Sequence, residues 1–331
     1  MKLGRVAEAA PGGFRARLVA VFPEAGHVVD LEVAETLRLM RRGATRAAGE
    51  RLARALFPSS MAQALAAGDA FLEACREAVA TADPAAQKNL GEVTWLAPLD
   101  PLLIRDCLLF EEHLEHAYSG LGLAIPPGFY EAPPYYKGNP ASVIGHDQEV
   151  RWPAYTQEMD YELELGLVTW RRGTNLDPES ASALLFGVTA VNDFSARDVQ
   201  RREMELRLGP YKSKDFATAL GPWITTADEL DVDRLEMVAR VNGEEWSRGN
   251  SGAMMLKAAE ILAFVSNGET VGPGELIGSG TVGGGCGLEL GRRLSPGDEV
   301  EVEIEGVGRL RNRLGRPETE GWSPGQRRQM P

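Results

Sequence analysis

Two glutamates separated by a single residue carry the strongest chemical signal in this sequence. On a β-strand, Glu162 and Glu164 would point to one face while Leu163 between them points to the other. Two carboxylates on one face repel each other, and they lose hydration if that face is buried. A hard divalent cation would remove both costs because such ions prefer oxygen ligands. The spacing therefore predicts a metal-dependent enzyme.

A second acidic segment could complete this site. Asp193 follows the apolar run 184–191 and is surrounded by polar residues. If Ser195 begins a helix, Arg197 and Gln200 lie three residues apart and share a face. A guanidinium and an amide would then point at one bound group. We predict that Asp193 supplies a third carboxylate to the metal site.

Alternating glutamates alone do not define a metal site. The same alternation recurs at Glu301, Glu303 and Glu305, with no comparable polar cluster next to it in the sequence. Such a pattern is typical of a solvent-exposed sheet face. The Asp193 segment is what distinguishes the first pair of glutamates from this second stretch.

Histidines and cysteines are scarce, which limits the kind of metal. The sequence contains four histidines and three cysteines, without a C-x-x-C pair. Zinc sites usually need clustered histidine or cysteine, so we predict an all-oxygen site for Mg²⁺, Mn²⁺ or Ca²⁺. His113 and His116 lie three residues apart on a predicted helix. This spacing is consistent with two ligands on one helix face and equally with a solvent-exposed helix without a site. The isolated cysteines indicate a reducing compartment, and we expect a cytoplasmic protein.

A glycine-rich segment at 278–287 contains the spacing G-x-G-x-x-G. A dinucleotide site would require a strand before this segment and a helix that begins in it. The turn signal at 295–298 leaves no room for that helix, and the lysine of a P-loop is missing. We therefore expect these glycines to let the backbone approach a ligand or another strand closely.

The elements that would position these residues divide the chain into two parts. Residues 14–22 and 27–31 are predicted strands, and the alanine-rich stretch 32–82 has helical periodicity. The arginines of that stretch favour a solvent-exposed helix face. After about residue 96, proline, glycine and short apolar runs predict a mostly-β catalytic domain. Its predicted elements are strands at 161–170, 184–191, 236–241 and 299–305 and a helix at 256–265. The predicted domain organisation is an N-terminal domain at 1–95, the catalytic domain at 96–313 and a loose polar tail at 314–331.

Composition argues against some classes of partner. The chain has 331 residues and a formal net charge of −13, which argues against nucleic-acid binding because phosphates require a cationic face. No stretch approaches the roughly 18 apolar residues that a membrane span needs, and residues 1–5 do not resemble the start of a signal peptide. We expect neither a membrane span nor export.

Five motifs occur in an order that is specific to one family. Together they resemble the fumarylacetoacetate hydrolase family in its bacterial form, and they lie at 135–142, 160–165, 192–200, 209–216 and 278–290. The resemblance implies an α+β, mostly β fold, with a mixed β-sandwich roll as catalytic domain and a smaller α/β domain before it. It also implies a homodimer, a divalent metal with Mg²⁺ as first candidate, and a small 1,3-dioxo or 2-oxo acid as substrate.

The resemblance assigns roles to individual residues. Four carboxylates match the family's metal ligands: Asp106, Glu162, Glu164 and Asp193. Catalytic roles fall to His113, to Glu289 as the carboxylate that pairs with it, and to Lys214, while His116 is left without a role. The groups matched to substrate contacts are Arg197, Gln200, Tyr136 and Thr281.

The reaction that the resemblance implies is hydrolysis of a carbon–carbon bond in an acylpyruvate-like or fumarylacetoacetate-like substrate. The metal would polarise a carbonyl group, and His113, oriented by Glu289, would take a proton from the attacking water. Lys214, Arg197 and Gln200 would stabilise the oxyanion. The presence of both His113 and Glu289 favours hydrolysis. The alternatives are a 2-oxo acid decarboxylase, isomerase or hydratase on the same metal site, and a metal-stabilised binding protein without activity.

Overall fold

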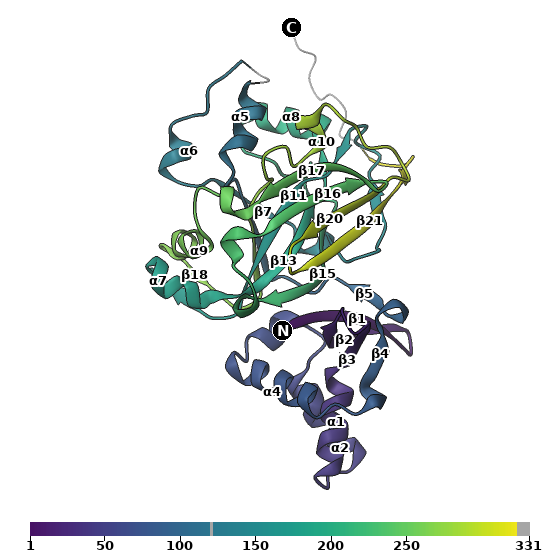
Figure 1. Ribbon diagram of the computed structural model, residues 1–331. Helices are drawn as coiled ribbons and strands as arrows, with labels where there is room; N and C mark the ends of the chain where they lie inside the picture. The colour runs from purple at the N-terminus through teal and green to yellow at the C-terminus, as the bar shows by residue number, and fades with distance from the viewer. Residues whose placement is uncertain (120–121, 323–331) are drawn as a thin grey trace.

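One large sheet extends through both parts of the molecule. The computed structural model describes residues 1–119 and 122–322 (Figure 1). The sheet has twelve strands, and β1 pairs with β15, so the sheet crosses the predicted domain boundary near residue 95. Its path runs through β4 (Gln87–Asn89), β3 (His27–Asp30), β2 (Gly13–Phe22), β1 (Lys2–Ala10), β15 (Thr218–Thr226), β13 (Leu185–Asp193), β11 (Leu163–Thr169), β19 (Glu275–Gly278), β6 (Leu103–Cys107) and β7 (Tyr135–Gly138), with β5 (Thr94–Leu96) on β1 and β8 (Val143–Ile144) on β15.

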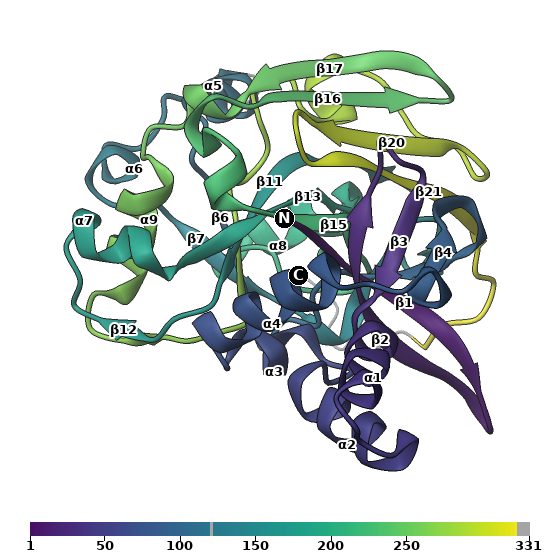
Figure 2. The same cartoon turned by 60° about the horizontal axis from the view of Figure 1, so that its bottom comes forward.

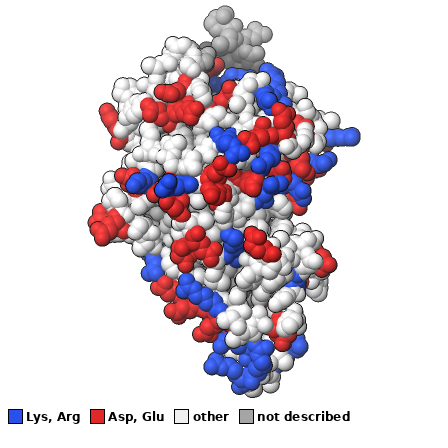
Figure 3. Space-filling model, in the orientation of Figure 1, with Lys and Arg blue, Asp and Glu red and all other residues white. Residues whose placement is uncertain are grey.

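The N-terminal part combines the first strands of this sheet with four helices. These helices are α1 (Leu31–Arg41), α2 (Arg46–Leu56), α3 (Met61–Leu65) and α4 (Asp69–Ala80). The predicted strands and the predicted helical stretch are confirmed, but β1 was not predicted. Helix α1 begins where Asp30 accepts a hydrogen bond from the backbone N–H of Val33 at 3.1 Å. Basic and acidic side chains are interspersed over most of the face in Figure 3, except for a basic group at the tip formed by α1 and α2.

A second, five-stranded sheet packs on the first and makes the sandwich. Figure 2 shows β16, β17 and β20 as a layer over β11, β13 and β15. Apolar side chains of both layers share one core, among them Leu165, Val188, Met237 and Val302. The mostly-β sandwich predicted from the family resemblance is therefore confirmed. In order the strands are β17 (Glu244–Asn250), β16 (Glu236–Val241), β20 (Glu299–Ile304), β21 (Gly308–Pro317) and β9 (Val150–Trp152).

The last strand corrects one prediction. Strand β21 continues to Pro317, and Leu314 pairs with Val150 of β9. The prediction of a loose tail from residue 314 was therefore wrong for residues 314–317, because the partner strand β9 lies more than 160 positions earlier in the sequence. Residues 323–331 of the predicted tail lie outside the described residues.

Short elements surround the two sheets. Helices α5, α8 and α10 gather at the end of the molecule that lies opposite α1 and α2 (Figure 1). The helices are α5 (Glu111–Ser119), α6 (Gly128–Glu131), α7 (Pro178–Ala181), α8 (Arg197–Glu205), α9 (Ala258–Ser266) and α10 (Gly287–Leu290). The 3₁₀-helices are η1 (Pro84–Ala86), η2 (Leu90–Glu92), η3 (Pro140–Ser142), η4 (Ser182–Leu184), η5 (Ala227–Glu229), η6 (Val232–Arg234) and η7 (Ser251–Ala253). Two small ladders pair β10 (Met159–Asp160) with β14 (Ser195–Ala196) and β12 (Gly173–Thr174) with β18 (Thr270–Val271).

The predicted strands and helix of the catalytic part are found with shifts of at most two residues at their ends. Strand β11 begins at Leu163, so Glu162 lies just before it. Strand β13 extends to Asp193 itself. Among the described residues, no helix has the length and apolar character required to cross a bilayer.

The glycine-rich segment packs against the backbone of β6. A Cβ on Gly280 would lie 2.0 Å from the carbonyl oxygen of Cys107, and Gly280 has φ +77°. The close approach predicted for these glycines is therefore confirmed. The helix that follows, α10, has only four residues, as expected for a segment without a dinucleotide fingerprint.

Replacing Gly280 by alanine should destabilise the protein much more than the same change at Gly284. Both glycines have positive φ, +77° and +66°, but a Cβ at Gly284 meets nothing within 4 Å. The Gly284→Ala variant should lose about 1–2 kcal/mol from backbone strain alone, and Gly280→Ala more than about 3 kcal/mol. Denaturant unfolding measures both free energies. Equal losses would contradict the close contact with Cys107.

Candidate active site

Four buried carboxylates converge where three strands of the large sheet end. Each offers one oxygen, and these oxygens all lie within 4.8 Å of one another. Asp193 is the last residue of β13, and Asp106 lies near the end of β6. Glu162 lies just before β11, and Glu164 is the second residue of that strand. The glycine at position 278 leaves room for them, because a Cβ there would lie 2.6 Å from Asp106 Oδ1. All four predicted metal ligands are therefore brought together.

One half of this carboxylate cluster is already neutralised by a lysine. The Lys214 ammonium contacts Glu162 and lies 2.5 Å from Asp193 Oδ2. Burial favours the neutral amine, but the charges of Asp193 and Glu162 outweigh it and raise the pKa of Lys214. Burial also acts to raise the pKa of Glu162, but Lys214 and Arg197 lower it to about 2. Lys214 is therefore a permanent cation of the site.

The other two carboxylates, Asp106 and Glu164, have no cationic side chain in contact with them among the described residues. Within the described residues, Asp106 Oδ1 and Glu164 Oε2 are buried without a hydrogen-bond partner. The pKa values of Asp106 and Glu164 are raised well above the ordinary range, first by burial and then by neighbouring carboxylates. Uncompensated buried carboxylates are costly unless a cation binds them. An all-oxygen donor set of this kind fits a hard divalent cation such as Mg²⁺, Mn²⁺ or Ca²⁺.

Without divalent metal, the stability of the protein should decrease as the pH rises above about 4.5. The folded-state pKa values of Asp106 and Glu164 exceed those of the unfolded chain, which are near 4. Between these values the folded state binds more protons than the unfolded state, so the free energy of unfolding falls with increasing pH. Saturating Mg²⁺ should replace those protons, raise the unfolding temperature and remove the decrease.

Thermal unfolding in EDTA and in Mg²⁺, at a series of pH values from about 5 to 8, measures this effect. An unfolding temperature in EDTA that rises with pH over this range would contradict the assignment of raised pKa values to Asp106 and Glu164.

Arg197 holds Glu162 in place at the first turn of α8. Its Nη1 donates to Glu162 Oε1 at 2.7 Å and to Gln200 Oε1 at 2.9 Å, and its Nε donates to Asp160 Oδ2 at 2.8 Å. The prediction that Arg197 and Gln200 share a helix face is confirmed. The guanidinium is buried against Asp160 and Glu162, so in this arrangement it orients a predicted metal ligand. Sequence analysis missed Asp160, although its position two residues before Glu162 was an available signal.

Tyr136 and Thr281 border the carboxylate cluster from two other elements. The Tyr136 hydroxyl donates to Asp193 Oδ2 at 2.6 Å, and Thr281 Oγ1 lies 3.4 Å from Glu164 Oε1. Burial, followed by the charges of Asp193 and Asp106, raises the pKa of Tyr136 well above its usual value, so the hydroxyl remains a donor. Tyr136 and Thr281, two of the four groups predicted to contact substrate, thus lie at the edge of the predicted metal site.

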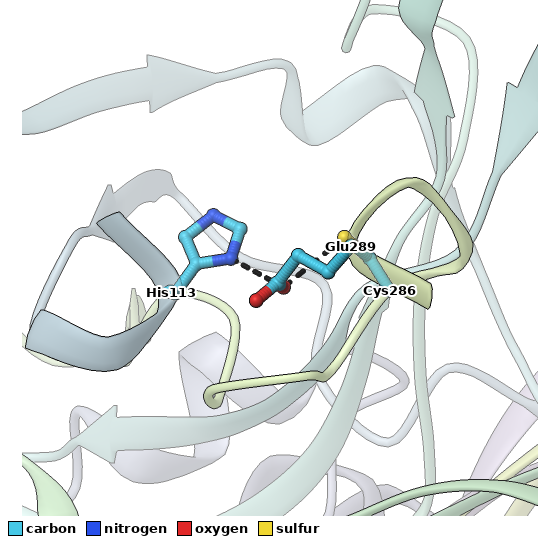
Figure 4. A group of neighbouring side chains, drawn as sticks. All are labelled: His113, Cys286 and Glu289. Atoms are coloured by element: carbon cyan, nitrogen blue, oxygen red, sulfur yellow. Dashed lines mark hydrogen bonds and ion pairs between the residues drawn. The ribbon is translucent and has the colours of Figure 1, made fainter. Parts of the chain in front are cut away.

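Two histidines of α5 share the carboxylate of Glu289 in α10. His113 Nδ1 lies 2.6 Å from Glu289 Oε1, and His116 Nδ1 lies 2.7 Å from Oε2 (Figure 4 shows the His113 contact). Burial acts to raise the pKa of Glu289, but the hydrogen bond and charge of His113 lower it. The predicted pairing of His113 with Glu289 is present in this geometry. His116, which was left without a role, contacts the same carboxylate, and its spacing of three residues from His113 was the available signal.

The second set of alternating glutamates pairs with arginines, but the predicted solvent-exposed face is wrong for Glu301, which is buried. On β20, Glu301 lies 3.3 Å from Arg309, and Glu303 lies 3.2 Å from Arg309 and 2.5 Å from Arg240. In the described part of the chain these glutamates belong to no group that could hold a metal ion. Alternating glutamates therefore indicate a metal site only where the fold places further carboxylates next to them.

Comparison with known proteins identifies the class. The family model for the fumarylacetoacetate hydrolase C-terminal domain matches residues 103–315. The chain therefore belongs to the fumarylacetoacetate hydrolase family, a superfamily of enzymes that act on small molecules.

Individual relatives are similar over most of this chain. The Bacillus subtilis oxaloacetate tautomerase YisK is 30% identical over 268 residues, which cover 78% of this chain and 87% of that protein. The human mitochondrial oxaloacetate tautomerase FAHD2A is 32% identical over 259 residues, covering 78% of this chain and 80% of that protein. A solved fumarylacetoacetate hydrolase from psychrophilic Exiguobacterium antarcticum superposes with a TM-score of 0.71 at 25% identity, covering 95% and 99% of the two chains.

Proposed function

We propose that this protein is a divalent-metal-dependent tautomerase or isomerase that moves a proton at the carbon next to the keto group of a small 2-oxo acid of the oxaloacetate type. The observation that carries the proposal is a buried, half-neutralised carboxylate cluster close to a histidine–glutamate pair. Relatives at 30% and 32% identity carry the name oxaloacetate tautomerase. The proposal adopts the isomerase alternative of the sequence analysis in place of hydrolysis, its first expectation.

The carboxylate cluster would hold the cation through Asp106, Glu162, Glu164 and Asp193. When bound, the cation supplies Lewis-acid polarisation of the 2-oxo group, which acidifies the neighbouring C–H bond. The unpartnered oxygens of Asp106 and Glu164 favour binding of a doubly charged ion, because the lysine neutralises only the other half.

His113 is the group that would move the proton. With Nδ1 donating to Glu289, its Nε2 carries the free lone pair of the ring. The lowered pKa of Glu289 keeps its carboxylate ionised, and this charge stabilises the imidazolium that forms when His113 takes a proton from carbon. The imidazolium then returns the proton to the enolate oxygen, which completes the tautomerisation.

Lys214 would stabilise the negative charge that develops on the substrate oxygen. Its raised pKa keeps the side chain as an ammonium at neutral pH. The ammonium is buried and fixed between two carboxylates, so it needs no reorganisation when charge appears nearby.

Hydrolysis of a carbon–carbon bond is the second candidate, favoured by the same His113–Glu289 pair. At 2.6 Å the pair is arranged to take a proton from water as well as from carbon. In that case the substrate would be an acylpyruvate or a related 1,3-dioxo acid, and two carbon fragments would be formed.

Product analysis separates these functions. Loss of enol absorbance would be followed on oxaloacetate and on a panel of acylpyruvates, with Mg²⁺ or Mn²⁺ and then with EDTA. The proposal predicts loss above the enzyme-free rate, an intact carbon skeleton and inhibition by EDTA. Two carbon fragments would support hydrolysis, release of CO₂ would support decarboxylation, and addition of water would support hydration. Metal-stabilised protein without turnover of any substrate would support a binding protein.

A further inference from the structure

A group of nitrogen, sulfur and oxygen donors lies next to the carboxylate cluster. One atom each from His113, Cys286 and Glu289 lies within 4.8 Å of the other two. His113 Nδ1 is 2.6 Å and Cys286 Sγ is 3.2 Å from Glu289 Oε1. Figure 4 shows the ring nitrogen and the sulfur both directed at this carboxylate. We infer that these three residues form a second metal site, which binds Zn²⁺ or a similar borderline cation.

The donor chemistry separates this site from the carboxylate cluster. Sulfur and imidazole ligands favour Zn²⁺, whereas a set of four carboxylates favours Mg²⁺, Mn²⁺ or Ca²⁺. Three protein ligands that leave an open fourth position are a common arrangement for zinc. The protein would therefore carry two neighbouring sites that select different cations.

The two contacts to Glu289 need only small shifts to accept the ion. Tetrahedral zinc with bonds of about 2.0–2.3 Å places its ligand atoms about 3.3–3.7 Å apart. The present contacts of 2.6 Å and 3.2 Å are hydrogen bonds, so the cation would take the place of their protons and widen each contact by about 1 Å or less. The thiol proton and the Nδ1 proton pass to solvent, and no electron transfer is involved.

The donors are held on the buried side, and the partly exposed His116 lies on the solvent side. Cys286 is fully buried and forms a β-bridge with Glu162, while Glu289 Oε2 accepts a hydrogen bond from the backbone N–H of Gly284 at 2.9 Å. His116, with a side chain that is 46% exposed, contacts the same Oε2 and provides a nitrogen at the solvent side. The side chains of His113 and Glu289 are themselves 15% and 3% exposed, so a cation would enter from the side of His113 and His116.

Occupancy of this site should inhibit the enzyme, a consequence that rests on the proposed function. A cation on His113 Nδ1 and Glu289 would separate the pair that moves the proton, while the carboxylate cluster keeps its own ion. Inhibition by Zn²⁺ should then persist at saturating Mg²⁺, because the two ions occupy different donors.

Cobalt spectroscopy tests the site without reference to activity. Co²⁺ would be titrated into the full-length protein in excess Mg²⁺, which keeps the carboxylate cluster filled. A thiolate-to-cobalt charge-transfer band should appear, disappear on addition of Zn²⁺, and be lost in Cys286→Ser. It should be retained in the matched control Cys75→Ser, whose thiol is buried in α4. Absence of the band in the wild type, or its persistence in Cys286→Ser, would overturn the inference.

Two further measurements complete the test. In His113→Asn the band should remain, with Co²⁺ affinity reduced at least about tenfold, since loss of even an outer-shell partner can cost that much. For turnover, the inhibitory Zn²⁺ concentration should rise at least about tenfold in Cys286→Ser. A band in a protein that turns over no substrate would contradict only the proposed function, whereas turnover without a band would contradict only the second metal site.

Discussion

Glu164→Gln should reduce metal-dependent turnover by about 10²–10³-fold, the equivalent of the several kcal/mol that a catalytic metal supplies. The substitution is nearly isosteric, but it removes one of the two carboxylates that Lys214 does not neutralise. Mg²⁺ affinity should fall with the turnover. In EDTA near neutral pH the same variant should be more stable than the wild type, because folding no longer requires this buried carboxyl group to take up a proton.

This opposite effect on activity and on metal-free stability is specific to a metal ligand. Turnover, Mg²⁺ titration calorimetry and thermal unfolding in EDTA measure the three quantities. The matched control is Glu303→Gln, which changes the alternating glutamates of β20 and should alter stability by less than about 0.5 kcal/mol. A Glu164→Gln protein that keeps wild-type Mg²⁺ affinity, or that loses stability in EDTA, would contradict the assignment.

His113→Asn should lower the turnover number by about 10²–10⁴-fold, the usual contribution of a general acid–base group. The amide of asparagine can still donate a hydrogen bond but cannot take up a proton at neutral pH. Mg²⁺ affinity should change little, because none of the four carboxylates is altered. Steady-state kinetics over a pH series, together with Mg²⁺ titration, gives both results.

His116→Asn is the control for this prediction, since His116 contacts the same carboxylate from the solvent side. We expect a loss of less than about tenfold, because its ring is partly exposed and contacts Glu289 from the solvent side. Equal losses in the two variants would show that His113 is not the single proton-transferring group. Full activity of His113→Asn would remove it from the mechanism.

The parts of the fold that could be predicted are those with strong local periodicity. Strands β11, β13, β16 and β20 were found because apolar runs or alternation mark them in the sequence. Strand β1 was missed because its residues Lys2–Ala10 mix charged and small side chains, and its pairing with β15 joins positions more than 200 residues apart. The same reason explains the end of β21, which is stabilised by the distant strand β9.

The residues of the candidate site also differ in whether a local sequence pattern predicts them. Glu162, Glu164 and Asp193 could be predicted from spacing and from the position of Asp193 after an apolar run. Asp106 has no pattern of its own and entered only through the family resemblance. The contact of His113 with Glu289 depends on how α10 packs beside α5, which no local pattern encodes, whereas Cys286 lies only three residues before Glu289.

Hydrogen exchange at carbon tests the central claim most directly. Oxaloacetate in D₂O would be followed by NMR with the enzyme and Mg²⁺, with the enzyme and EDTA, and with Mg²⁺ alone. The account predicts that the enzyme with Mg²⁺ introduces deuterium at the carbon next to the keto group faster than either control, with all four carbons of the substrate still joined. Exchange that is unaffected by EDTA, or cleavage of the carbon skeleton at the rate of exchange, would contradict it.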